Sequence, residues 1–453
     1  MEKNLTDGSV LKNLTLFSAP YLLSYFLQTL YGMADLFIIG QFEGVSSTTA
    51  VSVGSQVMHM LTVMIVGLTM GATVSIGQAV GARDKKSASG YTGNTVTLFA
   101  LLSLLLTVVL VLLVKPVVSV MSTPADAVSG TRQYLTVCFL GIPFITAYNV
   151  ISSVFRGMGD SKSPMYFIAV ACAANILLDY LFMGVFRMGP AGAALGTTLS
   201  QAISVAVSLA VILKRKTGIS VSAADLRPKK IFTGKILGIG LPIMFQDGLI
   251  QIAFIIITVI ANRRGLDDAA AVGIVEKIIS FLFLVPSSML SAVSALGAQN
   301  IGAGKPERAV ATLRYAVITA AGFGLAVAAV MQFVSEPVVS LFTDSSDPDG
   351  AAVIMLGGQY LRGYVWDCVF AGIHFSFSGY FCAVGRSEIS FFHNITAILL
   401  MRVPGVYLAS KFFPDTLFPM GIATAFGSLI SVCICIAAFL IISRNRTAFK
   451  KTL

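Results

Sequence analysis

Apolar runs, each long enough to form a membrane-crossing helix, recur along the whole chain and are separated by short polar segments. About 20 helical residues cross the roughly 30 Å hydrocarbon core of a bilayer. Backbone groups in lipid must be hydrogen-bonded within their own segment, so these runs are predicted to be helices. Twelve spans are expected, near residues 14–39, 50–79, 91–114, 131–157, 164–186, 190–213, 236–261, 270–297, 310–333, 354–384, 388–410 and 417–443.

The composition supports a membrane protein. Hydrophobic residues make up 56% of the 453 residues and charged residues only 11%, which lies outside the range of ordinary soluble domains. The six cysteines fall inside or at the ends of apolar runs without metal-ligand spacing, so they are expected to pack in the interior. The polar start of the chain leads into a span too long for a signal peptide, and no cleavage is expected.

The positive charge predicts how the chain lies in the membrane. The formal net charge is +10, but the basic residues are scattered through short loops, so nucleic-acid binding is not expected. With twelve spans, 22 of the 31 Lys and Arg residues lie on the side that holds both termini. Because positive loops stay in the cytoplasm, both termini are predicted to be cytoplasmic, in a multi-pass protein of the inner (plasma) membrane.

An internal repeat divides the chain in two. SIGQAVGARDKKSA at 75–88 aligns with LGAQNIGAGKPERA at 296–309, and FRGMGDSKSP at 155–164 aligns with FCAVGRSEIS at 381–390. These pairs predict two parallel six-helix lobes related by an axis along the membrane normal. The predicted parts are an N-terminal lobe at 1–213, a basic cytoplasmic linker at 214–235 and a C-terminal lobe at 236–453.

Two acidic residues lie deep in predicted spans of the first half. Asp35 is in the first span and Asp179 is in the fifth, and an acid in mid-membrane is a functional candidate because its insertion costs about 2.5–3.5 kcal/mol. Tyr31 and Asn175 each precede an acid by four residues, which stacks the side chains on one helix face. No basic residue at matching depth is apparent in either half, which favours protonation or ion binding.

A sodium ion would require several oxygen ligands, and Thr197 or Thr198 in the sixth span would add a hydroxyl to Asp35, Asn175 and Asp179. The same carboxyls would equally accept H+, because burial favours the neutral form. In the alternative, the two acids have no role in ion binding. Asp179 is then hydrated near the end of its helix, and Asp35 pairs with an Arg.

Polar residues in second-half spans are candidates for a substrate or second-lobe site: Gln246, Asp247, Glu276 and Asp367. Structural pairing or lining of a cavity is the main alternative role for them. Pro20 lies inside the first span and permits a kink there, so it is a candidate hinge, with a static kink as the alternative.

Several of these motifs together resemble the multidrug and toxic compound extrusion (MATE) family. They are FRGMGDSKSP, GQAVGARD after the second span, NILLDY in the fifth, and Pro20 fifteen residues before Asp35. The resemblance covers the whole chain. It implies an all-α membrane protein of twelve helices in two lobes around a central cleft, which exports drugs in exchange for Na+ or H+.

The resemblance also implies ion-coupling roles for Asp35, Tyr31, Asn175, Asp179 and Thr197. Asn149 and Ser153 of the fourth span are further candidates. The branch typified by NorM carries acids in spans seven and ten where this chain has apolar residues near Ile250 and Ala371. The chain therefore looks closer to the DinF or Mep-like branches, and an ion site in the second lobe is in doubt.

The expected function is secondary antiport of amphipathic, cationic organic compounds by alternating access, by a monomer without a bound cofactor other than the coupling ion. A lipid or lipid-linked oligosaccharide flippase of the same superfamily is the alternative, but it would require more basic residues within spans than Lys277 and Arg402. The sequence has no GxxxxGK[ST] phosphate-binding loop. An intramembrane enzyme is not expected, since the usual signatures around its catalytic acids are missing.

Overall fold

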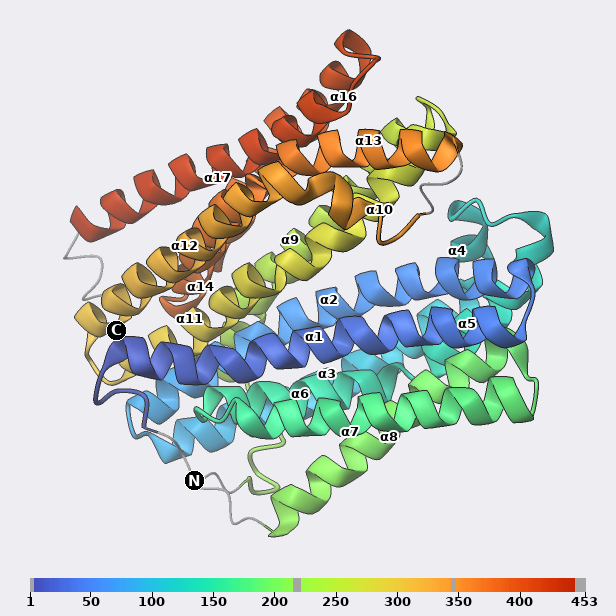
Figure 1. Cartoon of the computed structure of the whole chain (residues 1–453). Coiled ribbons are helices and arrows are strands. Elements are labelled where there is room, and N and C mark those ends of the chain that lie inside the picture. The colour runs from blue at the N-terminus through green and yellow to red at the C-terminus, as the bar shows by residue number, and fades with distance from the viewer. Residues whose placement is uncertain (1–3, 215–220, 344–347, 445–453) are drawn as a thin grey trace. The chain divides into compact units, whose positions relative to one another are not determined.

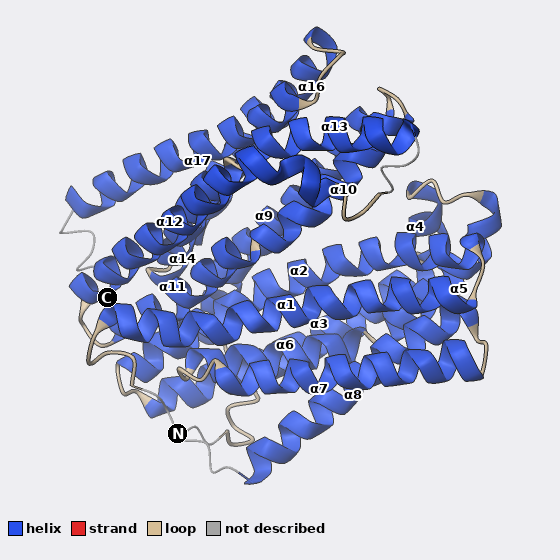
Figure 2. Ribbon diagram, in the orientation of Figure 1, coloured by secondary structure: helices blue, strands red, loops and turns tan. Residues whose placement is uncertain are grey.

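The computed structural model describes residues 4–214, 221–343 and 348–444. Within these ranges every regular element is a helix and none is a strand (Figure 2). The prediction of an all-α fold is confirmed. The predicted linker 214–235 falls partly outside the described residues, at 215–220.

The helices form two compact units, and each is described separately. The first unit contains residues 19–244 together with the short segment that ends at Leu5. Its elements (Figure 1) are most of α1 (Val10–Phe42), α2 (Val45–Gly81), α3 (Lys85–Leu112), α4 (Val114–Val120), the 3-10 turn η1 (Ala125–Ala127), α5 (Val128–Leu140), α6 (Ile142–Gly157), α7 (Lys162–Asp179), the π-helical turn η2 (Tyr180–Val185), α8 (Gly189–Lys214) and the first part of α9 (Lys230–Asn262).

The second unit contains residues 6–18 and the chain from Phe245 onward. After the remainder of α9 its elements are α10 (Leu266–Leu282), α11 (Leu284–Gly302), α12 (Pro306–Val339), α13 (Pro348–Tyr364), α14 (Asp367–Ala383), α15 (Ser387–Ala397), the π-helical turn η3 (Ile398–Arg402), α16 (Val403–Phe412) and α17 (Phe418–Arg444). The predicted lobe limits stay a prediction. The observed boundaries lie inside α1 and α9, close to Pro20 and Pro242.

Each of the twelve predicted spans corresponds to one helix or to consecutive helical segments. By length and composition, ten helices of the described residues suffice to cross a membrane, or eleven if α5 and α6, bent by 47°, form one span. The predicted span 354–384 comprises α13 and α14, of 17 residues each, and is interrupted at Val365 and Trp366. A break of this kind was not predicted from hydropathy, which measures apolar content rather than helix continuity.

The internal repeat is visible in backbone conformation. Arg83 and Gly304, which align in the first repeated motif, both have positive φ, of 57° and 70°. Gly159 and Gly385, which align in the second, have φ of 88° and 75°. Equivalent loops thus turn in the same way, although Arg83 adopts a conformation that L-residues rarely use.

Small residues bring helices into close contact within each unit. A Cβ on Gly240 of α9 would lie 2.3 Å from the Leu68 carbonyl oxygen of α2. In the second unit, a Cβ on Gly421 of α17 would lie 2.4 Å from the carbonyl oxygen of Tyr360 in α13. Such close backbone approach is typical of helix packing in membranes, where contact area and van der Waals fit replace the hydrophobic effect between helices.

The described part of the linker is held by α3. Asn94 donates to the Asp225 carbonyl at 3.0 Å and accepts from the Lys229 N–H at 2.7 Å, while the Thr97 hydroxyl donates to the Leu226 carbonyl at 2.7 Å. At the start of α3, hydrogen bonds from Ser87 lower the pKa of the Asp84 carboxyl, which caps the helix.

Candidate functional site

Four polar side chains from three helices converge inside the first unit. Asp35 of α1 is 3% exposed, and Asn175 and Asp179 of α7 are 1% and 0% exposed. Thr197 of α8 is half-buried. Its hydroxyl lies 3.1 Å from Asp35 Oδ2 and also 3.1 Å from the Ala193 carbonyl oxygen, one turn earlier. The structure therefore brings together the four residues that the sequence proposed as one site.

The two carboxyl groups lie beside each other. Asp35, Asp179 and Asn175 are close enough for their side chains to interact. Two carboxylates are both acceptors, so a bond between them requires a proton on one. Among the described residues, no donor reaches Asp35 Oδ1, either oxygen of Asp179, or the amide of Asn175. Buried polar atoms in native proteins are normally satisfied, so this cluster fits a bound cation or proton.

Local helix geometry positions Asp179. The four-residue spacing places Asn175 and Asp179 on one face of α7. Asp179 is the last residue of α7 and immediately precedes η2, and π-helical turns occur frequently at functional sites. On the facing helix, a Cβ on Gly196 would lie 2.0 Å from Asp179 Oδ1. Sequence reasoning missed Gly196, although it directly precedes Thr197.

The alternative without function finds no support in this geometry. Asp179 is fully buried rather than wetted at a helix end. Five ion pairs occur among the described residues, and none includes Asp35 or Asp179. The charge on these two carboxyls is therefore not balanced by a side-chain cation from the described chain.

The other first-half candidates are less closely tied to this cluster. Tyr31 lies one turn before Asp35 on α1 and is half-buried. Asn149 and Ser153 are buried on α6, where they donate to the Ile145 and Val150 carbonyls at 2.9 and 2.8 Å. Both side chains donate their hydrogen bonds to carbonyl groups of their own helix, so a role in ion or substrate binding stays a prediction.

In the second unit, the candidate residues do not form one site. Gln246 accepts a 2.6 Å hydrogen bond from Ser390 and lies 3.4 Å from Asp247 Oδ1. Glu276 is separate from this pair, with the Thr258 hydroxyl 3.3 Å from its Oε2 atom. Each acid thus has its own local partner.

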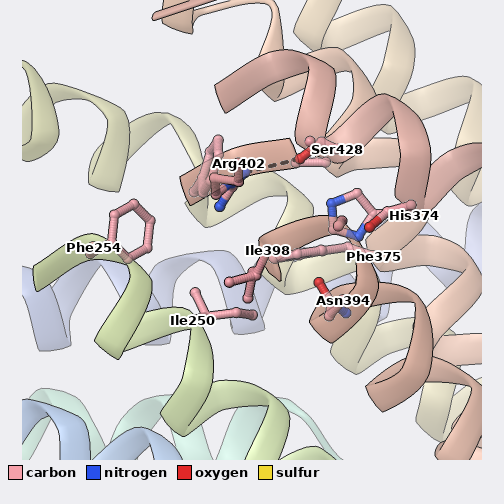
Figure 3. A pocket seen from close by; sticks show the side chains of 13 residues that line it. Ile250, Phe254, His374, Phe375, Asn394, Ile398, Arg402 and Ser428 are labelled. Atoms are coloured by element: carbon pink, nitrogen blue, oxygen red, sulfur yellow. Dashed lines mark hydrogen bonds between the residues drawn. The ribbon is translucent and has the colours of Figure 1, made fainter. Parts of the chain in front are cut away.

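Asp367 has a basic partner, and such structural pairing is the alternative named for the second-half candidates. Arg402 Nη2 lies 2.6 Å from Asp367 Oδ2. It also lies 3.0 Å from the Ser428 hydroxyl, as Figure 3 shows. Asp367 is 0% exposed and Arg402 is 8% exposed. Hydropathy alone did not reveal this pair, because 35 residues separate its members and contact depends on how α14 and η3 are rotated.

Comparison with known proteins identifies the family. The family model described as MatE matches residues 20–181 and 242–408. The chain belongs to the MatE family. The two matched stretches begin 222 residues apart, in agreement with the internal repeat. The chain is therefore a multi-pass membrane transporter, with small molecules as its substrates, and not an enzyme.

Relatives of this MatE chain match over nearly its whole length. The "Probable multidrug resistance protein YpnP" of Bacillus subtilis (strain 168) is 31% identical over 437 residues, which cover 96% of each chain. The "Multidrug export protein MepA" of Staphylococcus haemolyticus (strain JCSC1435) is 22% identical over 98% of this chain and 96% of its own.

A solved structure described as "Crystal structure of MATE in complex with MaL6" has a TM-score of 0.90, 24% sequence identity and 99% coverage of both chains. This likeness shows the twelve-helix, two-lobe fold. The branch within the family stays a prediction.

Proposed function

We infer that this MatE transporter is a secondary antiporter that exports amphipathic, cationic organic compounds in exchange for H+ or Na+. The observation that carries this proposal is the buried carboxyl pair Asp35 and Asp179, which no basic side chain of the described residues neutralises. The names of the relatives, which describe multidrug resistance and multidrug export, support the substrate class.

The cluster has the chemistry of a cation site. Two neighbouring desolvated carboxylates repel each other, so taking up a cation or proton is favourable, and the pair titrates as a unit. A proton would be shared between Asp35 and Asp179. For Na+, a hard cation, Asn175 Oδ1 and Thr197 Oγ1 would add neutral oxygen ligands to the carboxylates.

Coupling requires that the cation bind one conformation more tightly than the other. A ligand shifts an equilibrium only through such a difference, and moving a population from 1:99 to 99:1 takes about 5.5 kcal/mol. Asp35 and Asp179 lie on different helices, α1 and α7. A small movement of α1 relative to α7 would separate the two carboxyls and change cation affinity. This change in cation affinity would couple cation binding to alternating access of the transporter.

A flippase for lipid phosphates or lipid-linked sugars is less well supported. Such substrates would require unpaired cations in the membrane-spanning part, whereas the Arg402 guanidinium is paired with Asp367. We also propose that the protein acts as a monomer in the plasma membrane with both termini in the cytoplasm. It would use no bound cofactor other than the coupling ion and would bind no nucleic acid.

Transport by purified protein in proteoliposomes tests the proposal. Separately imposed Na+ and pH gradients identify the coupling ion, with tetraphenylphosphonium as the transported probe. Asp35→Asn and Asp179→Asn are each expected to abolish gradient-driven transport while leaving the protein monodisperse. Asp126→Asn, which changes an exposed acid in η1, is the matched control. Unchanged gradient-driven transport in both variants would refute the proposal.

A further inference from the structure

The second unit contains a structural counterpart of the carboxyl cluster, with a different charge. Gly196 and Thr197 in α8 place a hydroxyl residue directly after a glycine, and Gly427 and Ser428 do the same in α17. A Cβ on Gly196 would meet Asp179 Oδ1 at 2.0 Å, and a Cβ on Gly427 would meet Arg402 Cβ at 2.9 Å. Arg402 thus contacts α17 where Asp179 contacts α8.

Each of these two residues adjoins a π-helical turn, although at opposite ends of it. Asp179 directly precedes η2, and Arg402 is the last residue of η3. Both turns lie in the fifth span of their half, and Asp179 and Arg402 are separated by about the same interval as the repeated motifs. The hydroxyl contacts differ, because Thr197 bonds to Asp35, whereas Ser428 accepts a hydrogen bond from Arg402 itself.

This counterpart is already balanced in charge. The Arg402 guanidinium donates to Asp367 Oδ2 at 2.6 Å and to Ser428 at 3.0 Å. A buried carboxylate paired in this way has no need of a mobile cation, whereas the same carboxylate without its partner would be strongly unfavourable. The first unit has the opposite arrangement, with two acids and no basic partner among the described residues.

Arg402 and Ser428 lie at the edge of a small cavity with a partly polar wall. The cavity has a volume of about 40 Å³, and His374 and Asn394 also lie in its wall (Figure 3). Its size suits one small ion or water molecule. Asp367 Oδ1 is buried and has no hydrogen-bond partner in the described part of the chain. Unlike the first-unit cluster, this site contains one acid rather than two, and Arg402 balances its charge.

We propose that Arg402 is a built-in substitute for the coupling cation, so that Asp367 and Ser428 form a closed site that takes up no ion. This inference rests on the proposed antiport function, in which the ion acts at Asp35 and Asp179. It predicts that replacing the Arg402 charge converts the second unit into a site for Na+ or H+.

Cation binding to purified full-length protein tests this assignment. The parent is Asp35→Asn/Asp179→Asn, which removes the first-unit site. Bound ²²Na+ is measured at equilibrium, and proton uptake is measured by potentiometric titration. Arg402→Gln in this parent is expected to gain a single Asp367-dependent cation, and Arg402→Gln/Asp367→Asn is expected to lose it. Arg402→Lys keeps the charge and is expected to show no gain.

Two outcomes would overturn the inference. One is an Asp367-dependent cation in the parent with Arg402 intact, and the other is a monodisperse Arg402→Gln variant that gains none. If Arg402→Gln does not fold, Asp367→Asn in the otherwise native protein decides. Its cation stoichiometry is expected to be unchanged, and loss of one cation would refute the closed site. Retained coupling in the Asp35→Asn/Asp179→Asn parent would instead refute the proposed function.

Discussion

Asp179 lies against a helix position at which only glycine fits. A Cβ on Gly196 would lie 2.0 Å from Asp179 Oδ1, so Gly196→Ala must displace the carboxyl or separate α7 from α8. Overpacking of this kind costs about 1–3 kcal/mol. If this free-energy cost weakens cation binding alone, affinity for the coupling ion should drop by roughly 5–150-fold.

The measurement for Gly196→Ala is the dependence of transport rate on the concentration of the coupling ion. Gly273→Ala in α10 is the matched control, because a Cβ there meets no atom within 4 Å. A normal ion dependence for Gly196→Ala would show that Asp179 need not hold its observed position.

The Thr197 hydroxyl offers a second test of the cluster. Its 3.1 Å hydrogen bond to Asp35 would be lost in Thr197→Val, which has nearly the same shape, and kept in Thr197→Ser. A hydrogen bond to a charged group contributes about 1.5–3 kcal/mol. Thr197→Val should therefore weaken coupling-ion affinity at least roughly tenfold. Thr197→Ser should remain close to the native protein, and equal effects of both changes would contradict the assigned role.

At the scale of the helix, α1 is the element whose movement the coupling hypothesis needs. It continues from Val10 to Phe42 through Pro20, and its first part belongs to the second compact unit while residues from Ala19 belong to the first. Pro20 cannot donate a backbone hydrogen bond. The Ser24 hydroxyl donates a hydrogen bond to the Pro20 carbonyl at 2.7 Å. A backbone hydrogen bond is thus missing close to the point where α1 passes from one unit to the other.

Pro20→Ala should stiffen α1 by restoring a backbone hydrogen bond. Turnover in proteoliposomes is expected to fall several-fold, while tetraphenylphosphonium binding at equilibrium changes little. Pro337→Ala is the control, because Pro337 lies inside α12, which belongs entirely to the second unit. Equal losses in both variants would point to a general effect on stability rather than to a hinge.

Sequence reasoning located the helices well because hydrophobic content is a local property. It also placed Asn175 and Asp179 on one helix face, since four-residue spacing fixes that geometry. It could not derive the contact between Thr197 and Asp35, which lie 162 residues apart. It proposed their common site from the oxygen ligands that Na+ requires and from the family resemblance. It missed the pairing of Arg402 with Asp367, because η3 and the break before α14 alter the helix rotation that a regular helix would predict.

For the whole molecule, the repeat explains why two similar halves have different polar interiors. The loops at Arg83 and Gly304, and at Gly159 and Gly385, keep the same positive φ, so the backbone scaffold is shared. The buried charges are not shared. A duplicated scaffold with one cation site left open and one closed would give a transporter in which a single lobe senses the ion gradient.

Orientation in the membrane also belongs to this scale, because it decides which loops face the cytoplasm. The positive-inside bias predicts that Lys85, at the start of α3, is cytoplasmic and that Lys115, in α4, is external. Lys85 and Lys115 are both exposed. Of the six cysteines only Cys433 is exposed, so a Cys433→Ser parent should show little background labelling.

In intact cells, a membrane-impermeant maleimide should modify Lys115→Cys at once and Lys85→Cys only after permeabilisation. The parent without an added cysteine controls for background. The reverse pattern would place both termini outside and would contradict the predicted orientation.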